Sequence, residues 1–195
     1  MSTRDRILAE AFSAVSRRGF GPVSVDSIVA AAGVTKGAFY HYFPSKRALG
    51  VSLVEEVIRP LILAERLAPL ERSVDPLAAL LQLVRWAEEN VTERRLAAGC
   101  PLNNLSQEVS SLDEELRAAV VAVVEAWSDG LADEVRRAQE IGAVRPDLDP
   151  REVATFLVAF WQGAMGLAKA TRDRSTLRAC RLGLERYLRS IAETD

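Results

Sequence analysis

The chain has 195 residues, of which 49% are apolar and 27% are charged, and its formal net charge is −2. This composition supports a buried core in one or two domains. No apolar run comes near the roughly 20 residues that a membrane span needs, and the first residues lack the apolar stretch of a signal peptide. We therefore expect a soluble, cytoplasmic protein.

The few cysteines and histidines exclude several kinds of metal centre. Cys100 and Cys180 lie far apart in the sequence, and His41 is the only histidine. A zinc site of cysteines and histidines needs more ligands than these, and a di-iron centre in a helical bundle needs two histidines. We expect no metal, no other cofactor and, in a reducing compartment, no structural disulfide.

Charge is distributed unevenly along the chain. Residues 1–50 contain seven basic and three acidic residues and have a net charge of +4, which leaves −6 for the remainder. A basic N-terminal part on an acidic body indicates that the N-terminal part meets a polyanion.

The first expected helix runs from an N-cap at Thr3 to about Arg18. Its apolar residues recur every three or four positions and form one face: Ile7, Leu8, Ala11, Phe12 and Val15. The run Gly19-Phe20-Gly21-Pro22 ends it.

Three further helices follow in quick succession. Ser24 caps a short helix over residues 25–32, which Gly33 stops. Thr35 caps a third helix over residues 36–42. After Pro44 and Ser45 a fourth helix runs from Lys46 to about Leu67.

The remaining periodicity predicts five more helices, over residues 75–98, 102–110, 113–140, 150–171 and 175–192. Breaks are expected at Gly99-Cys100-Pro101, at Gly142 and at Pro146. Strand signals are weak throughout. The expected fold class is all-α, with about nine helices.

Residues 24–46 contain two short helices joined by a tight glycine turn, with helix 3–18 as the third wall. Phe39 and Phe43 form the apolar side of the second short helix, and Lys36, Tyr40, His41 and Tyr42 lie on its other side. This is a helix-turn-helix arrangement, whose second helix enters the major groove of DNA by its N-terminal end. Without the surrounding pattern, Tyr40 and Tyr42 could also be ordinary surface tyrosines with no DNA contact.

The segment Gly-Val-Thr-Lys-Gly-Ala-Phe-Tyr-His-Tyr-Phe-Pro-Ser-Lys, residues 33–46, resembles the DNA-binding domain of the TetR (TetR/AcrR) family of bacterial regulators. The resemblance covers about residues 3–54. It implies a DNA surface formed by seven residues: Thr35, Lys36, Gly37, Tyr40, His41, Tyr42 and Lys46. In physical terms, Lys36 suits a guanine edge, Gly37 lets the backbone approach the bases, and Tyr40, Tyr42 and Lys46 suit phosphate oxygens.

The same resemblance implies a helix-turn-helix DNA-binding domain over residues 1–48 and a helical ligand-binding and dimerisation domain over residues 49–195. It implies a homodimer that binds a palindromic double-stranded operator, located on the bacterial nucleoid when bound, and that is released by a small effector. No charged cluster in the body suggests a particular ligand, so we expect a modest, mostly apolar molecule.

Residues 150–171 are apolar nearly all round, which indicates burial on both sides. Gly163 and Gly166 each cost roughly 1 kcal/mol inside a helix, and a close helix approach would explain them. We therefore expect this helix and the one over residues 175–192 to pair with their copies in a second protomer. Ordinary packing within one chain is the alternative.

The candidate pocket residues are large or apolar side chains on the middle helices: Leu61, Leu81, Trp86, Leu105, Val124, Trp127, Phe160, Trp161 and Met165. Such side chains are also typical of plain core. The run from Gly99 to Leu105 resembles a segment in a subset of these regulators, some of which sense electrophiles or oxidants through a cysteine. Cys100 is thus a candidate redox residue, and a small buried apolar residue is the alternative.

Two rival interpretations concern the whole chain. An enzyme is not expected, because the sequence shows no nucleophile–base set, no phosphate-binding loop and no metal cluster. The other rivals are a helical small-molecule-binding protein without DNA binding and a cysteine-based redox- or electrophile-sensing repressor.

Overall fold

A computed structural model describes residues 1–109 and 113–193. The chain forms two compact units, one of residues 1–61 with 101–123 and one of residues 62–100 with the chain from Val124 onward. Within the described residues the regular structure is helical, apart from an isolated bridge between Val144 and Ala192. The expected all-α fold is confirmed, whereas the expected functional boundary at residue 48 stays a prediction.

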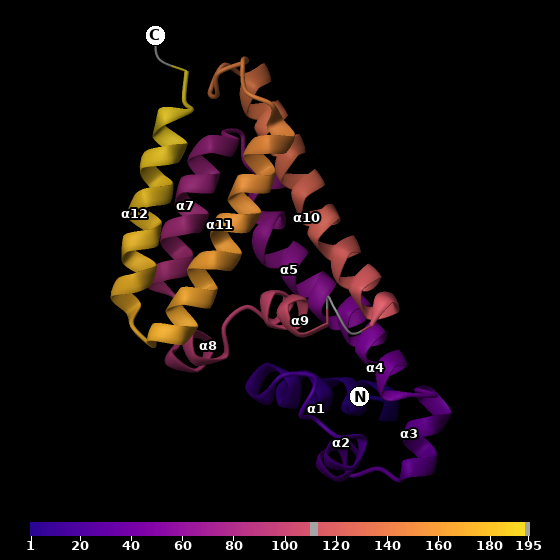
Figure 1. The fold of residues 1–195 in the computed structure, drawn as a ribbon. Coiled ribbons are helices and arrows are strands. Elements are labelled where there is room, and N and C mark those ends of the chain that lie inside the picture. Colours follow the sequence, from indigo (N-terminus) through magenta and orange to yellow (C-terminus); the bar gives the residue numbers. More distant parts are fainter. Residues whose placement is uncertain (110–112, 194–195) are drawn as a thin grey trace. The chain divides into compact units, whose positions relative to one another are not determined.

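The first unit begins with α1 (Thr3–Arg18), α2 (Val25–Ala32) and α3 (Lys36–Tyr42), shown in Figure 1. Four hydroxyl side chains cap α1, α2, α3 and the following α4 (Lys46–Leu53) by accepting a backbone N–H three residues on: Ser2, Ser24, Thr35 and Ser45. The cap of α1 corrects our expectation of Thr3. Ser2 takes this place because Asp5 completes a reciprocal capping box with it.

The core of the first unit lies where α1 packs against α2, α3 and α4. Its most deeply buried side chains come from the four helices and from Phe43, directly after α3: Ile7, Ala11, Ile28, Phe39, Phe43, Leu49 and Leu53. Short helices such as α2 and α3 are marginal alone, so this shared core stabilises them.

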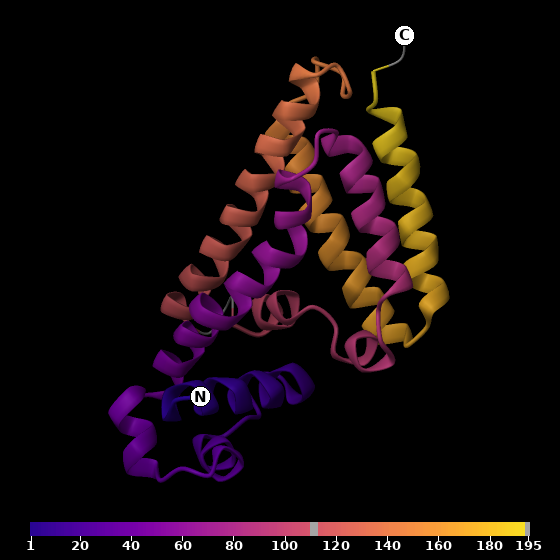
Figure 2. The same cartoon turned by 180° about the vertical axis from the view of Figure 1, so that it is seen from behind.

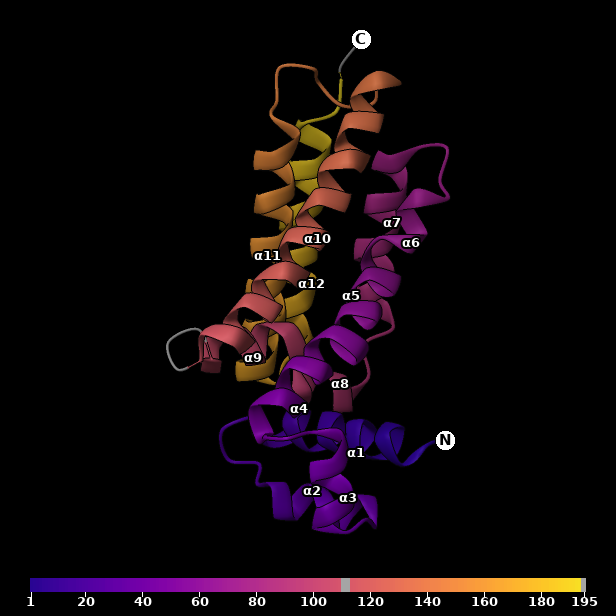
Figure 3. The same cartoon turned by 90° about the vertical axis from the view of Figure 1, so that its right-hand side faces the viewer.

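The helix expected over residues 46–67 is helical but not uniform. It consists of α4, a π-helical turn η1 (Val54–Ile58) and α5 (Arg59–Arg66). Pro60 has no N–H to donate to the fourth residue before it, and its ring crowds the Glu56 carbonyl. The wider π turn ahead of Pro60 accommodates this. A one-turn helix that the sequence did not indicate, α6 (Ala68–Glu71), follows and packs against α7 (Pro76–Glu89) (Figure 3).

The helix expected over residues 75–98 is in fact two helices, α7 and α8 (Glu93–Ala98). Asn90 ends α7, and the Thr92 side chain accepts the N–H of Arg95 and starts α8. The sequence pattern predicted one continuous helix here, but the threonine side chain caps a new helix and so divides the stretch in two.

Four further helices complete the described fold: α9 (Pro101–Val109), α10 (Glu114–Glu140), α11 (Pro150–Thr171) and α12 (Arg174–Ser190). Ser110, where we expected α9 to end, lies outside the described residues. In the second unit α12 packs against both α7 and α11 (Figures 1 and 2). Asp75 and Asp149 cap α7 and α11 directly ahead of a proline, as the first-turn prolines predicted.

One of the described helices, α11 with 22 residues, is long and apolar enough to cross a membrane by length and composition alone. The expectation that no segment comes near this length is therefore wrong for α11. The core helix of a soluble protein meets the same criterion. In the structure α11 contributes six buried side chains to the second unit: Val153, Ala154, Leu157, Val158, Met165 and Ala168.

Candidate functional site

The helix α3 separates apolar and polar side chains as the sequence predicted. Phe39 is 0% exposed and Phe43 is 1% exposed, whereas Tyr40 is 51% and Tyr42 is 39% exposed. Thr35, Lys36, Gly37 and His41 are also exposed. The N-terminal turn of α3 and its outer side therefore form one accessible polar surface, which we call the α3 surface: Thr35, Lys36, Gly37, Tyr40, His41 and Tyr42.

Lys36 is already paired within the first unit. Its Nζ lies 2.8 Å from Oδ1 of Asp26 in α2, and both side chains are mostly exposed. The hydrogen bond with Asp26 raises the pKa of Lys36. Exposed ion pairs contribute only about 0–1 kcal/mol, so a DNA phosphate or base edge competes readily with Asp26 for this ammonium group.

Lys46 is placed differently from the rest of the predicted DNA surface. Its Nζ donates to the Gly21 carbonyl at 2.9 Å and lies 4.6 Å from the centre of the Phe20 ring. Burial lowers the pKa of Lys46, and the charge of Glu108 opposes this. In this structure the ammonium group therefore holds the loop between α1 and α2.

Glu108 of α9 holds the same loop from the other side. One oxygen of its carboxylate, Oε2, accepts the backbone N–H groups of Phe20 at 2.7 Å and Gly21 at 3.0 Å. Gly19, at φ 84°, lies so close that a Cβ there would be 2.5 Å from the other oxygen. The sequence did not predict this role of Glu108, because its partners lie about ninety residues away and no local pattern indicates the contact.

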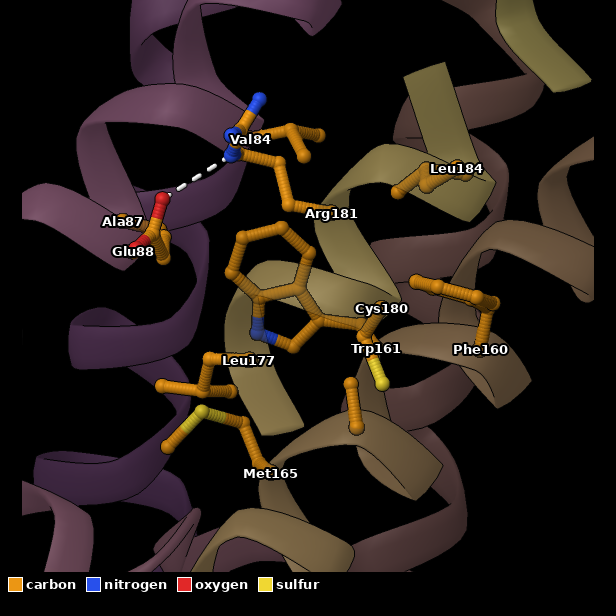
Figure 4. Close-up of a pocket in the computed structure, with 11 residues that line it drawn as sticks. Val84, Ala87, Glu88, Phe160, Trp161, Met165, Leu177, Cys180, Arg181 and Leu184 are labelled. Atoms are coloured by element: carbon orange, nitrogen blue, oxygen red, sulfur yellow. Dashed lines mark hydrogen bonds and ion pairs between the residues drawn. The ribbon is translucent and has the colours of Figure 1, made fainter. Parts of the chain in front are cut away.

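The second unit contains several small cavities that share Trp161. One, of about 360 Å³ counting the open space at its mouth, is lined by Trp161, Phe160 and Met165 of α11 together with residues of α7 and α12. Figure 4 shows the Trp161 indole among these residues, beside the ion pair of Glu88 and Arg181. A second cavity, of about 350 Å³ when its open space is counted in the same way, is lined by Trp161, Trp127 and leucines of four helices.

The predicted pocket residues divide into two groups. Trp127, Phe160, Trp161 and Met165 line the two cavities just described, and Trp86, 54% exposed, lines a separate groove. The other four residues do not line these cavities: Leu61, Leu81, Leu105 and Val124. Leu105 is 1% exposed and belongs to the core of the first unit, so its apolar character reflects packing.

Arg66, at the end of α5, is a cavity residue that sequence reasoning missed. Its side chain lines two of the cavities with Trp161, and the residue is only 6% exposed. The one available signal was its spacing. Arg66 follows Ile58 and Ile62 at intervals of four, on the buried side of the helix.

Neither cysteine forms a disulfide. Cys100 is 5% exposed and directly precedes α9. Cys180 is partly exposed and lines the cavity of Figure 4. The burial of Cys100 favours the reading of a small apolar residue over that of a reactive thiol.

The helices α11 and α12 leave part of their apolar surface uncovered. Phe156 and Leu167 of α11 are 41% and 57% exposed, and Leu182 of α12 is 38% exposed. A Cβ added at Gly163 or Gly183 would meet no atom within 4 Å. Exposed apolar side chains and open glycines on two helices that pack together are features expected of an interface between copies of the chain.

Comparison with known proteins places both parts of the chain in one family. Residues 7–52 match the family model for bacterial regulatory proteins of the tetR family, and residues 76–184 match the model for the Tetracyclin repressor-like C-terminal domain.

Individual relatives agree with these matches. The transcriptional regulator AcuR of Cereibacter sphaeroides is 37% identical over 155 residues, which cover 80% of this chain and 71% of AcuR. The transcriptional repressor DhaR of Mycobacterium sp. strain GP1 is 31% identical over 174 residues, 89% of this chain and 86% of DhaR. The crystal structure of a regulatory protein TetR from Rhodobacter sphaeroides superposes with a TM-score of 0.83 at 31% identity, over 93% of this chain and 96% of that one. The chain belongs to the TetR family of bacterial transcriptional regulators.

Proposed function

We propose that this regulator binds a near-palindromic operator as a homodimer and releases it when a small molecule occupies the second unit. The observation that carries the DNA-binding part is the α3 surface, which is exposed on a helix whose other side is locked into the core. Regulators of this family are not enzymes, and we propose no catalytic role. The site of action is the bacterial cytoplasm, on the nucleoid when DNA is bound.

On the α3 surface, Lys36 and Gly37 approach base edges at the N-terminus of the helix, and Tyr40 and Tyr42 bond phosphate oxygens. His41 contacts a base or the backbone. Lys46 supports this surface by fixing the loop at Gly21. A direct phosphate contact by Lys46 would require its Nζ to leave the Gly21 carbonyl.

A gel shift with DNA from upstream of the protein's own gene tests this proposal. The wild-type chain should shift the fragment, and Lys36→Ala should change the ranking of operator variants more than the overall affinity. Loss of a bidentate base contact costs about 1–3 kcal/mol for the matching base pair. Lack of any shift at physiological salt would refute DNA binding and leave a helical small-molecule-binding protein.

The dimer would form through the uncovered surfaces of α11 and α12, including Phe156, Leu167 and Gly163. The support is their exposure in the single chain. Two copies of α3 on a two-fold axis would then present two recognition helices to two half-sites.

Ligand control follows from linkage. An effector that binds better to the DNA-free conformation must weaken DNA binding by the same factor, and couplings of about 1–3 kcal/mol are usual. Repeating the gel shift with candidate ligands measures this factor directly. A cysteine-based switch at Cys100 is the weaker alternative, since the thiol is 5% exposed.

A further inference from the structure

Three buried hydrogen-bond donors without a partner belong to side chains that line one cavity of the second unit. They are Nε of Arg66, Nε1 of Trp127 and Nε1 of Trp161, which find no acceptor among the described residues. All three side chains line the second of the cavities described above. Its remaining lining is entirely aliphatic: Leu80, Leu83, Val84, Leu131, Leu157, Leu184 and Leu188. Buried polar groups in folded proteins are rarely left unpaired, so three of them in one place require an explanation.

Arg66 also brings a buried charge, which the charge of the adjacent Glu65 favours without forming an ion pair with it. Its guanidinium carbon lies 3.8 Å from the centre of the Trp161 ring, and none of the carboxylates in the described part of the chain forms an ion pair with it. Glu65, the adjacent acid, is engaged by both terminal nitrogens of Arg95. Burial lowers the pKa of Arg66 to about 10, which leaves the group charged at neutral pH.

The missing partner must therefore be an acceptor with a negative charge. A carboxylate is acceptor-only and offers about four lone-pair sites, enough for all three donors. A water molecule carries no charge and brings two donors of its own into a site that already has an excess of donors. The aliphatic walls, in turn, suit a short hydrocarbon chain.

We propose that this cavity binds a small organic carboxylate, whose oxygens accept from Arg66, Trp127 and Trp161 and whose aliphatic part contacts the surrounding leucines. This inference rests on the proposed function, because it names the chemical class of the effector. It adds a carboxylate group to the modest, mostly apolar ligand expected from the sequence. The open space among these side chains is much smaller than in sites for drug-sized ligands, which limits the ligand to the shortest carboxylates.

Binding is tested on the full-length protein without DNA, by thermal unfolding and by tryptophan fluorescence. The probes are propanoate, butanoate and hexanoate, each compared with the matching neutral amide and with chloride and phosphate at equal ionic strength. We expect saturable stabilisation and a fluorescence change with a carboxylate, and at least ~10-fold weaker binding of its amide, because charge-assisted hydrogen bonds are the stronger ones. Equal effects of amide and carboxylate, or of chloride and carboxylate, would overturn the proposal.

Variants assign the effect to the cavity. Arg66→Met keeps an apolar stem of similar length and should fold while losing the carboxylate response. Arg72→Met removes an exposed arginine of the same unit and should respond like the wild type. If Arg66→Met does not fold, Arg66→Lys keeps the charge without the planar guanidinium and should weaken binding ~10-fold or more.

The tryptophans supply a second matched pair. Trp127→Phe and Trp161→Phe each remove one donor and keep an aromatic ring, so each should weaken carboxylate binding several-fold. Unchanged affinity in both Trp127→Phe and Trp161→Phe would overturn the assignment of the donors.

Operator release is measured separately from carboxylate binding. A carboxylate that binds but does not release the operator would refute the effector role named here. Absence of carboxylate binding to the wild type would overturn this inference, while the gel shift without ligand still decides the proposed DNA binding on its own.

Discussion

Removing the Glu108 carboxylate tests how the loop between α1 and α2 is held. In Glu108→Ala the backbone N–H groups of Phe20 and Gly21 lose their shared acceptor, at 2.7 and 3.0 Å. Hydrogen bonds to a charged group contribute about 1.5–3 kcal/mol each when well buried. Gly21 is exposed and Phe20 is only partly buried, so water replaces much of this energy. We expect a loss of about 1–3 kcal/mol in the free energy of unfolding.

The assay combines thermal unfolding with operator affinity. For a chain of this size each kcal/mol lowers Tm by about 2–4 °C, so the expected decrease is roughly 2–12 °C. Operator affinity should also fall, because the loop leads into α2 and Lys46 loses the charge that favours its ammonium form.

The direction of the DNA effect is decisive. If Glu108 were only a surface acid, its removal would make the protein less negative and would strengthen DNA binding. Glu55→Ala, which removes an exposed acid of the same unit, measures that electrostatic effect alone. A gain in operator affinity by Glu108→Ala equal to the gain by Glu55→Ala, with Tm unchanged, would refute the reasoning.

Four further outcomes are expected. Lys46→Ala should lower Tm and leave the salt dependence of operator binding unchanged, whereas a slope flattened by about one unit would identify a phosphate contact. Gly130→Ala should destabilise the protein by about 1–3 kcal/mol, since its new Cβ would overlap a methyl group of Leu67; an unchanged Tm would mean that Leu67 relaxes freely. Leu167→Glu should yield monomers in analytical ultracentrifugation, and a dimer that persists at micromolar concentration would move the interface elsewhere. Cys100, 5% exposed, should stay unmodified in native protein treated with mild electrophile, and mass spectrometry showing selective adducts there would revive the sensing hypothesis.

Local signals in the sequence were enough for the α3 surface. The hydroxyl N-caps and the glycine turn locate α2 and α3 within a residue, because caps and left-handed glycines satisfy backbone groups by contacts three to five residues away. The spacing of Phe39 and Phe43 likewise defines the buried side of α3. The remaining residues of α3 are then predicted to be exposed.

Local signals in the sequence did not predict where a long helix is interrupted. The break between α7 and α8 depends on Thr92 as an N-cap, and the π turn before Pro60 depends on a small change in hydrogen bonding. Both changes preserve the apolar periodicity on either side, so the pattern alone predicted longer, uniform helices.

By itself, the sequence determined the class of the fold, the helix-turn-helix and the polar surface of α3, since each arises from residues within a few turns of one another. Only the tertiary structure decided that Glu108 holds the loop at Gly21 and that the buried Arg66 lies over the Trp161 ring without an ion-pair partner among the described carboxylates. An exposed arginine and a buried one look alike in a charged helix, and a contact between residues about ninety positions apart leaves no periodic trace. Such pairings depend on which side chains the folded backbone brings together and shields from water.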